Sequence, residues 1–264
     1  MHRFVTLCLA LGLVSACATT PDAQMPVVQQ AVEIEQAEQQ VKPKLGLFTT
    51  LPIYWGEGGA IDAILASGAE RDWVRAELER DFEIVPLDTL EAEQLGQLNR
   101  VFLAQPRPLA PSENVSFDAF IARGGQALIM ADPRLTRHSE YAIGDRRRPQ
   151  DVALLSPILA RLGARLEYDD MQQGGPRLVE ADEVAFPVNQ AGRFVSVPSD
   201  VVPDGCAVKA DAAILARCER GEGVVYLFAD AALLDWEEDA QTVPAEQRAA
   251  FRALLQPLVQ DSAR

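Results

Sequence analysis

The stretch 117–133, FDAFIARGGQALIMADP, contains the end of a helix, a glycine pair, a short apolar run and a polar turn. Its apolar side chains recur at helical spacing up to Gly124-Gly125, where glycine can adopt the left-handed backbone that ends a helix. The run ALIMA (127–131) has no polar interruption, which is typical of a strand buried on both faces. The stretch therefore predicts a helix that leads into a strand of a parallel sheet.

The same alternation of strands and helices continues on both sides of this stretch. The expected elements are strands 45–50, 82–87, 100–104, 127–131 and 165–168, helices 72–80, 89–98 and 151–162, and a helix from Ser112 with Val115, Phe117, Phe120 and Ile121 on its apolar face. Such alternation implies parallel strands, right-handed crossovers and helices on both faces of the sheet. The predicted fold is α/β, with an open, mostly parallel sheet of flavodoxin-like or amidotransferase-like type.

The pattern changes after Gly174, where short β-rich pieces replace the alternation. These pieces are 177–179, 184–186, 193–197 and 213–218. ERGEG (219–223) predicts the turn of a hairpin whose second strand is 224–229. A last helix at 246–258 closes a single predicted domain, 45–260, which carries this β-rich C-terminal insertion.

Residues 1–16 have the pattern of a secretory signal. A weakly basic start precedes the apolar run 4–14, which is shorter than the roughly 20 residues that a membrane-spanning helix needs. VSAC (14–17) matches a lipobox, so we expect cleavage before Cys17 and attachment of lipid to its thiol; a simple signal with an incidental cysteine is the alternative. Several acyl chains together give durable membrane anchoring.

The predicted location is the cell envelope, with the lipid anchor in a bilayer and the protein facing the periplasm. Ala18 follows the lipidated cysteine in place of the aspartate that retains lipoproteins at the inner membrane, which favours the outer membrane. Residues 17–44 are rich in glutamine and have no aromatic side chain, so we expect a lipidated, disordered tether.

Cys206 and Cys218 are the cysteines that remain for the mature fold. An even pair in an oxidising compartment predicts a disulfide, with two reduced thiols as the alternative. His138 is the one histidine left after cleavage, and no CxxC spacing occurs, so we expect neither a metal nor a cofactor. The net charge of −15 argues against a nucleic-acid partner.

Ligands of open parallel sheets bind beyond the carboxyl ends of the strands. The loop TTLPIYWGEGG (49–59) therefore offers Thr49, Trp55 and Glu57, although its aromatic rings could instead pack on the domain. It lacks GxGxxG and a Walker lysine, so nucleotide binding is not expected. QPRP (105–108) predicts a rigid turn.

Two further loops supply charged candidates for binding. The turn after 127–131 contains Asp132, and GDRRRPQD (144–151) contains Arg146, Arg147 and Asp151. Arginine forks recognise carboxylate or phosphate, with pairing to local acids as the alternative.

The chain is not expected to be an enzyme. A nucleophile elbow would place serine or cysteine among glycines where Asp132 precedes a proline, and His138 lies in a polar loop. Hydrolysis by carboxylates that pair only in space stays open.

Four stretches, LGLFTTLPIYWGEGG (45–59), RVFLAQP (100–106), 117–133 and GVVYLFADAALLD (223–235), resemble the GldG-like auxiliary proteins of ABC-type transport systems. These proteins share a domain with an intraflagellar-transport component and look like relatives of the class I glutamine amidotransferase fold. Amidotransferases need an elbow cysteine, where this chain has Asp132, and a late histidine, whereas none follows His138. The resemblance therefore implies the fold without that catalysis.

The resemblance implies a non-catalytic binding or scaffold lipoprotein associated with an ABC-type transport system. Its lipid anchor would replace the membrane helices of GldG-like proteins, and it would hold a glycan-like ligand or a protein partner, such as a transporter subunit or another envelope protein. The alternative is a repurposed hydrolase that acts on envelope material.

Overall fold

The computed structural model describes residues 42–56, 72–139, 141–210, 212–236 and 242–260. The predicted signal, the lipidation site Cys17, most of the tether and Glu57 lie outside these residues. Within the described part of the chain, no helix is long and apolar enough to cross a membrane.

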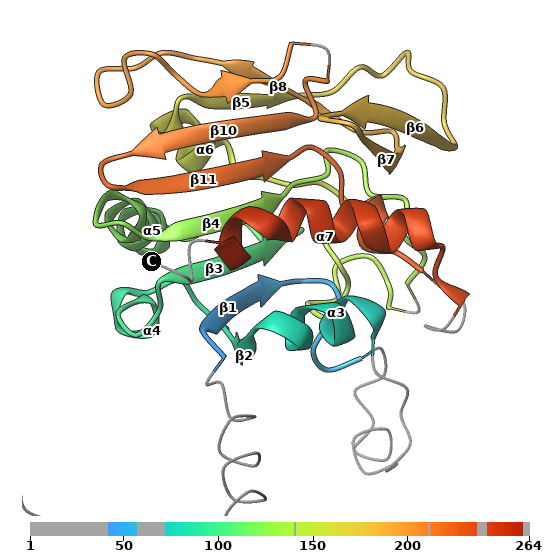
Figure 1. Cartoon of the computed structure of the whole chain (residues 1–264), viewed down its shortest axis with the longest axis horizontal. Helices are drawn as coiled ribbons and strands as arrows, with labels where there is room; N and C mark the ends of the chain where they lie inside the picture. The colour runs from blue at the N-terminus through green and yellow to red at the C-terminus, as the bar shows by residue number, and fades with distance from the viewer. Residues whose placement is uncertain (1–41, 57–71, 140, 211, 237–241, 261–264) are drawn as a thin grey trace, which may run out of the picture. The chain divides into compact units, whose positions relative to one another are not determined.

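A seven-stranded sheet forms the centre of the fold, in the order β2-β1-β3-β4-β11-β10-β9 (Figure 1). The strands are β1 (Lys44–Thr49), β2 (Glu83–Pro86), β3 (Arg100–Ala104), β4 (Gln126–Met130), β9 (Ala207–Val208), β10 (Leu215–Arg220) and β11 (Gly223–Phe228). The five strands from β2 to β11 in that order are parallel, and β10 and β9 are antiparallel to their neighbours. The predicted α/β class, the largely parallel sheet and the hairpin of β10 and β11 are confirmed.

Helices pack on both faces of this sheet. They are α3 (Trp73–Asp81), α4 (Ala92–Leu95), α5 (Pro111–Ala122), α6 (Ser156–Leu162), the short 3-10 helix η1 (Ala232–Leu234) and α7 (Ala245–Gln260). On one face, Phe251 of α7 packs between Phe102 of β3, at 5.9 Å between ring centroids, and Trp73 of α3, at 5.5 Å. The neighbouring Val101 points to the other face, because successive strand residues alternate. Figure 1 shows α7 crossing β3 and β4.

The segment between β4 and β11 forms two small sheets outside the central one. β5 (Ala164–Glu167) pairs antiparallel with β8 (Arg193–Ser196), and β6 (Pro176–Ala181) forms a hairpin with β7 (Val184–Asn189). The expectation that strand 165–168 continues the parallel alternation is therefore wrong. Among the described residues between β5 and β10, strands follow in place of a crossover helix, and β5 pairs antiparallel with β8.

Two predicted helices are shorter in the structure than the sequence pattern indicates. In the predicted helix 89–98, the N–H of Leu90 donates to Glu113, and only Ala92–Leu95 is helical. In the predicted helix 151–162, the N–H of Ala153 donates to the carbonyl of Asp132, and the helix begins at Ser156. Pro157, in the first turn of α6, has no N–H to donate to the carbonyl of Ala153, so this helix does not extend back to Asp151.

The expected apolar face of α5 is correct except at Val115. Phe117, Phe120 and Ile121 are fully buried, whereas Val115 is 70% exposed. Glu113 is buried on the same side as Phe117, four residues later, since residues i and i+4 share a helix face. Val115 lies two positions from both and therefore points to the opposite side.

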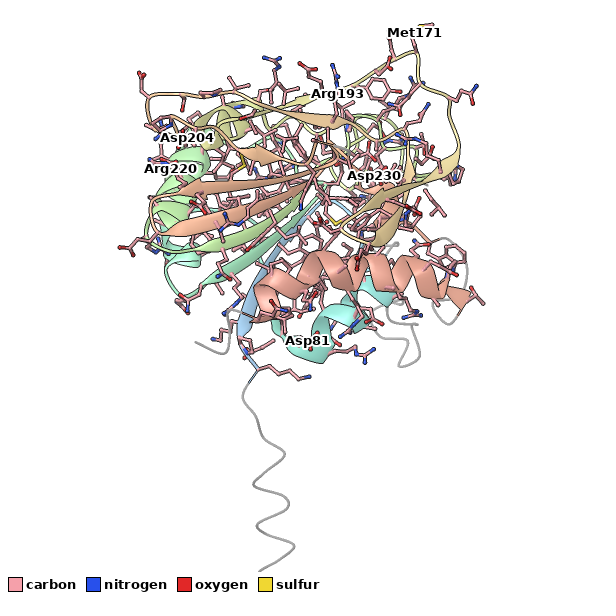
Figure 2. All side chains as sticks on the ribbon, turned by 45° about the horizontal axis from the view of Figure 1, so that its top comes forward. Asp81, Met171, Arg193, Asp204, Arg220 and Asp230 are labelled. Atoms are coloured by element: carbon pink, nitrogen blue, oxygen red, sulfur yellow. A yellow bond between two sulfur atoms is a disulfide. The ribbon has the colours of Figure 1, made fainter. Side chains whose placement is uncertain are left out.

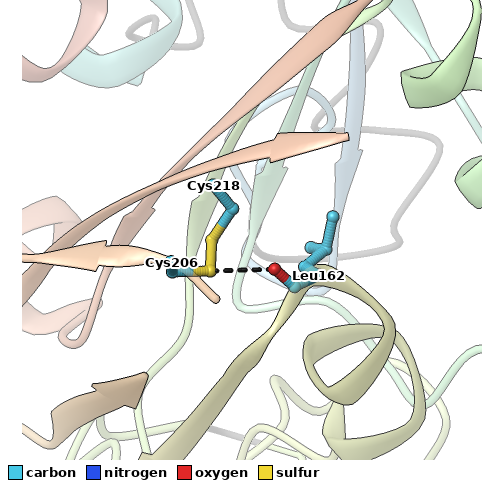
Figure 3. The surroundings of a disulfide bond; sticks show 3 residues. All are labelled: Leu162, Cys206 and Cys218. Atoms are coloured by element: carbon cyan, nitrogen blue, oxygen red, sulfur yellow. Dashed lines mark hydrogen bonds between the residues drawn. A yellow bond between two sulfur atoms is a disulfide. The ribbon is translucent and has the colours of Figure 1, made fainter. Parts of the chain in front are cut away.

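The predicted disulfide is confirmed. Cys206 and Cys218 are bonded and buried, and they join the segment before β9 to β10 (Figure 3). The Cys206 sulfur lies 3.0 Å from the carbonyl oxygen of Leu162, the last residue of α6. The bond therefore fixes the antiparallel edge of the sheet beside α6.

Candidate functional site

The sheet has a topological switch point between β1 and β3. The chain passes from β1 to β2 on one side and then returns to β3 on the other side of β1. Connections that diverge in this way leave a crevice at the carboxyl ends of the two strands, where open α/β sheets bind their ligands. A cleft of about 460 Å³ lies at this position.

We call this feature the switch-point cleft. Its lining residues come from the ends of β1 and β2, the loop after β3 and the loop 141–149: Phe48, Thr49, Thr50, Leu51, Pro52, Trp55, Gly56, Leu87, Asp88, Arg107, Tyr141, Arg146, Arg147 and Pro149. The structure thus brings together Thr49, Trp55, Arg146 and Arg147, which the sequence placed on two separate loops.

An exposed tryptophan stands at the cleft. The Trp55 side chain is 69% exposed, and its ring meets the Tyr54 ring edge-on at 4.7 Å between centroids. Tyr54 is held in turn by Arg75, whose guanidinium lies 4.2 Å from the Tyr54 ring centroid and donates to the Tyr54 carbonyl oxygen at 2.8 Å. Trp55 therefore does not pack into the domain, and its flat face is presented by a supported turn.

The two threonines of the cleft serve mainly to hold its walls together. The Thr49 hydroxyl donates to the Ala104 carbonyl of β3 at 2.7 Å and accepts from the Leu51 N–H at 2.9 Å. The Thr50 hydroxyl donates to the Gln105 carbonyl and accepts from the Gln150 N–H. A hydroxyl carries one proton, so neither threonine can donate to a ligand without giving up one of these bonds.

Arg107 was missed by the sequence analysis, which treated residues 105–108 as a plain turn. Its guanidinium lies 4.9 Å from the Phe48 ring centroid and forms two hydrogen bonds of 2.7 Å with Glu113. This pairing is the largest cause that lowers the pKa of Glu113 to about 2. Glu113 also accepts from the Ala110 N–H as a helix cap. The sequence feature that could have pointed to a partner for Arg107 is therefore this glutamate in the first turn of α5, after Pro111.

Of the three consecutive arginines in the loop 144–151, two form ion pairs with acids of the same loop. Arg147 pairs with Asp145 at 2.7 Å and lies over the Tyr141 ring at 4.3 Å. Arg148 pairs with Asp151 at 3.1 Å, so the predicted site residue Asp151 serves as an ion-pair partner and is not among the residues that line the cleft. In the described part of the chain, Arg146 has neither an ion pair nor a hydrogen bond.

Gln105 separates the cleft from the ends of the neighbouring strands. It is fully buried, with a backbone φ of 42°, in the left-handed region that non-glycine residues seldom adopt. Its side-chain amide donates to the carbonyls of Asp132 and Gln150 at 3.1 and 2.8 Å, and its oxygen accepts from the Asp132 N–H at 2.8 Å. This one side chain ties β3 to the loops on both sides.

The carboxyl ends of β4 and β11 are sealed by two buried acids. Asp132 and Asp230 are both 0% exposed, and Asp230 lies in the interior in Figure 2. Asp132 accepts from the N–H groups of Arg134 and Ala231, and Asp230 accepts from those of Asn189 and Leu233. The sequence predicted that the Asp132 carboxylate binds a ligand at the surface. In the structure it is buried and accepts hydrogen bonds from backbone N–H groups.

Burial dominates the electrostatics of this acid pair. Loss of hydration raises the pKa of Asp132 to about 6. Burial, and then the charge of Asp132, raise the pKa of Asp230 well above its usual value. Two carboxyl groups this close do not both ionise readily, so a proton is held in the sealed end at a pH where exposed aspartates are charged.

No known family model matches the chain, and none of the curated proteins matches it. Among solved structures, an exo-β-1,4-mannosidase from Opitutaceae bacterium strain TAV5 is similar at 16% identity and a TM-score of 0.47, over 88% of this chain and 39% of the mannosidase. The mmIFT52 N-terminal domain is similar at 12% identity and a TM-score of 0.48, over 83% of this chain and 97% of that domain. A ThuA-like protein from Bacteroides uniformis gives 13% identity and a TM-score of 0.42, over 83% and 91%.

This chain spans 39% of the mannosidase and 33% of a GH42 β-galactosidase from the same comparison. At these identities and scores, the function of this chain has to be argued from its own cleft.

Proposed function

We propose that this chain is a non-catalytic, lipid-anchored binding protein of the cell envelope that holds a ligand or partner in the switch-point cleft. The observation that carries the proposal is Trp55, a large aromatic side chain that stays 69% exposed at the crevice beside the switch point of β1 and β3. Exposed aromatic and arginine side chains are enriched where proteins bind partners.

The proposal includes an amidotransferase-like arrangement of the sheet and kinship with GldG-like auxiliary proteins. Its support is the strand order with the switch point at β1 and β3, together with the sequence stretches that resemble that family. An association with an ABC-type transport system follows from that kinship, with Cys17 as the membrane anchor, and the outer membrane is favoured by Ala18.

Two acid pairs converge among the described residues. Asp72 and Asp235 lie near each other, but Asp72 caps α3 and Asp235 pairs with Arg137. The hydrolase alternative would otherwise use the second pair, Asp132 and Asp230. Both are fully buried and accept backbone hydrogen bonds. General acid–base catalysis requires that the acid reach the substrate at hydrogen-bond distance. Binding at the open cleft is therefore the better supported of the two.

Photocrosslinking in living cells tests the binding site. A photoreactive phenylalanine analogue at position 55 of the full-length chain should form a reproducible adduct, and transporter subunits among its partners would support the association. The matched control places the analogue at Val115, which is 70% exposed on α5 and outside the cleft lining. Equal adducts at both positions, or none at position 55, would contradict the proposal.

Metabolic labelling with a radioactive fatty acid tests the anchor separately. The wild-type chain should incorporate label and sediment with membranes, whereas Cys17→Ser should do neither. Unlabelled wild-type protein would refute lipidation at Cys17 without bearing on the cleft.

A further inference from the structure

Three arginine side chains line the switch-point cleft in a protein whose net charge is −15, and one of them has no counter-ion among the described residues. They are Arg107, Arg146 and Arg147, against a single lining acid, Asp88. Glu113 and Asp145 satisfy Arg107 and Arg147 at 2.7 Å each. Arg146 keeps its charge and all its donors available, since it has no partner in the described residues.

The ion pairs of Arg147 and Arg148 hold the loop that carries the unpaired Arg146. Asp145 fixes Arg147 over the Tyr141 ring, and Arg148 donates to the Tyr141 carbonyl at 3.0 Å while it pairs with Asp151. The loop that presents Arg146 is thus held by its own two neighbours. A guanidinium presented in this way offers a planar fork that matches a carboxylate or a phosphate.

The size and surface of the cleft limit the class of ligand. Its volume of about 460 Å³ falls in the range of about 300–1,000 Å³ that holds small molecules. The lining mixes apolar groups such as Leu51 and Pro52 with polar ones in comparable measure. Trp55 adds a flat, exposed aromatic face against which a ring can lie. A polar ring that bears a negative group fits all three features.

We propose that the switch-point cleft binds a small sugar that carries an anionic group, with Arg146 on the anion and Trp55 against the sugar ring. The proposal rests on the proposed function in that it takes the cleft as the ligand site. It goes further by naming the ligand class and the residue that selects it. A carboxylate and a phosphate share the chemistry that Arg146 recognises, and the probes below distinguish them.

Titration calorimetry on the purified mature domain tests this assignment with two matched pairs of probes. Glucuronate is compared with its methyl ester, and glucose 6-phosphate with glucose. The anionic member of at least one pair should bind about 10- to 100-fold more tightly than its neutral counterpart, the range expected for a hydrogen-bonded charge. Whichever pair shows this difference identifies the anionic group.

Variants locate the binding. Arg146→Gln should weaken the anionic probe about 10- to 100-fold and leave the neutral one unchanged, whereas Arg146→Lys should retain part of the selectivity. Trp55→Ala should weaken both members of the pair. The matched control is Arg177→Gln, because Arg177 is an exposed arginine of β6 outside the cleft lining, and it should leave both affinities unchanged.

Equal affinities for the anionic and neutral probes would overturn the anionic selectivity while leaving the cleft as a ligand site. Absence of binding by all four probes, or binding that ignores both Arg146→Gln and Trp55→Ala, would overturn the sugar assignment. The proposed function fails only if crosslinking at position 55 also gives no adduct, so the two failures can be told apart.

Discussion

The carboxyl edge of the central sheet has two ends of opposite character. At β1 and β3 the edge is open, with an exposed tryptophan and three arginines around a cleft. At β4 and β11 it is closed, with two buried acids bonded to backbone N–H groups. The difference teaches that a strand-end position alone does not make a binding residue, because a polar side chain there can equally be used to close the fold.

Removal of a buried acid at the closed end should cause the largest loss in the free energy of unfolding. Asp230→Ala leaves the part-buried N–H of Asn189 and the buried N–H of Leu233 without acceptors, and each costs about 1–3 kcal/mol, so a loss of about 2–6 kcal/mol is expected in urea unfolding. The control at the open end is Asp88→Ala, an exposed residue, which should change stability by less than about 0.5 kcal/mol. Similar losses for both variants would erase the contrast between the two ends.

Reduction of the Cys206–Cys218 bond should weaken the closed half without altering the open one. A loop of this length predicts a loss of about 2–4 kcal/mol, because the disulfide restricts the unfolded chain. The double variant Cys206→Ser with Cys218→Ser should unfold at lower urea than the oxidised protein. Crosslinking from position 55 should persist under conditions where the variant stays folded; its disappearance would mean that the cleft depends on the antiparallel edge.

Gln105 joins the two ends, so its loss should affect both. Gln105→Ala removes three hydrogen bonds and leaves the buried Asp132 N–H unsatisfied, with an expected destabilisation of about 1–3 kcal/mol. The loop at Gln150 also loses a tie beside the cleft, so crosslinking from position 55 should decrease. Thr136→Ala is a control, since it removes a hydroxyl in the exposed Asn189–Thr136 hydrogen bond. Unchanged crosslinking in Gln105→Ala would show that the cleft does not depend on the hydrogen bonds of the Gln105 side chain.

The pH dependence of stability should have opposite signs at the two ends. The pKa of Asp132 is raised from 3.8 to about 6, so the folded state binds more protons and this acid's contribution falls as pH rises from about 4 to about 6. The pKa of Glu113 beside the cleft is lowered from 4.5 to about 2, so its contribution is present above pH 4.5 and lost as pH falls toward 2.

Urea unfolding at a series of pH values, with Asp132→Asn and Glu113→Gln as references that do not titrate, measures these slopes. The stability of the wild type relative to Asp132→Asn should decrease from pH 4 to pH 6. Relative to Glu113→Gln it should increase from pH 2 to pH 4.5. Slopes of the same sign would show that the two acids lie in similar environments.

The parallel sheet was predictable because its strands are short apolar runs and its helices show apolar spacing. Phe117, Phe120 and Ile121 are buried as their spacing indicates, and the hairpin of β10 and β11 follows its glycine turn. Two helices were predicted too long. α6 begins at Ser156 because Pro157 has no N–H for a helical hydrogen bond to the carbonyl of Ala153, and α4 spans only Ala92–Leu95.

The open end of the edge was partly predictable. The rule that strand ends converge selected Thr49, Trp55, Arg146 and Arg147, which the structure brings to one cleft. The same rule selected Asp132, which the structure buries. Its partner donor, the N–H of Ala231, lies 99 residues away, so no local pattern marks the difference.

The sequence by itself determined the order of strands and helices, because helical and strand periodicities are set by local backbone geometry. It also indicated the disulfide pair, since Cys206 and Cys218 are the two cysteines outside the predicted signal and lipidation site. Only the tertiary structure decided which polar strand ends are open and which are sealed. The physical reason is that the burial of a charged group depends on hydrogen-bond donors brought by distant segments, as Ala231 is brought to Asp132 and Asn189 to Asp230.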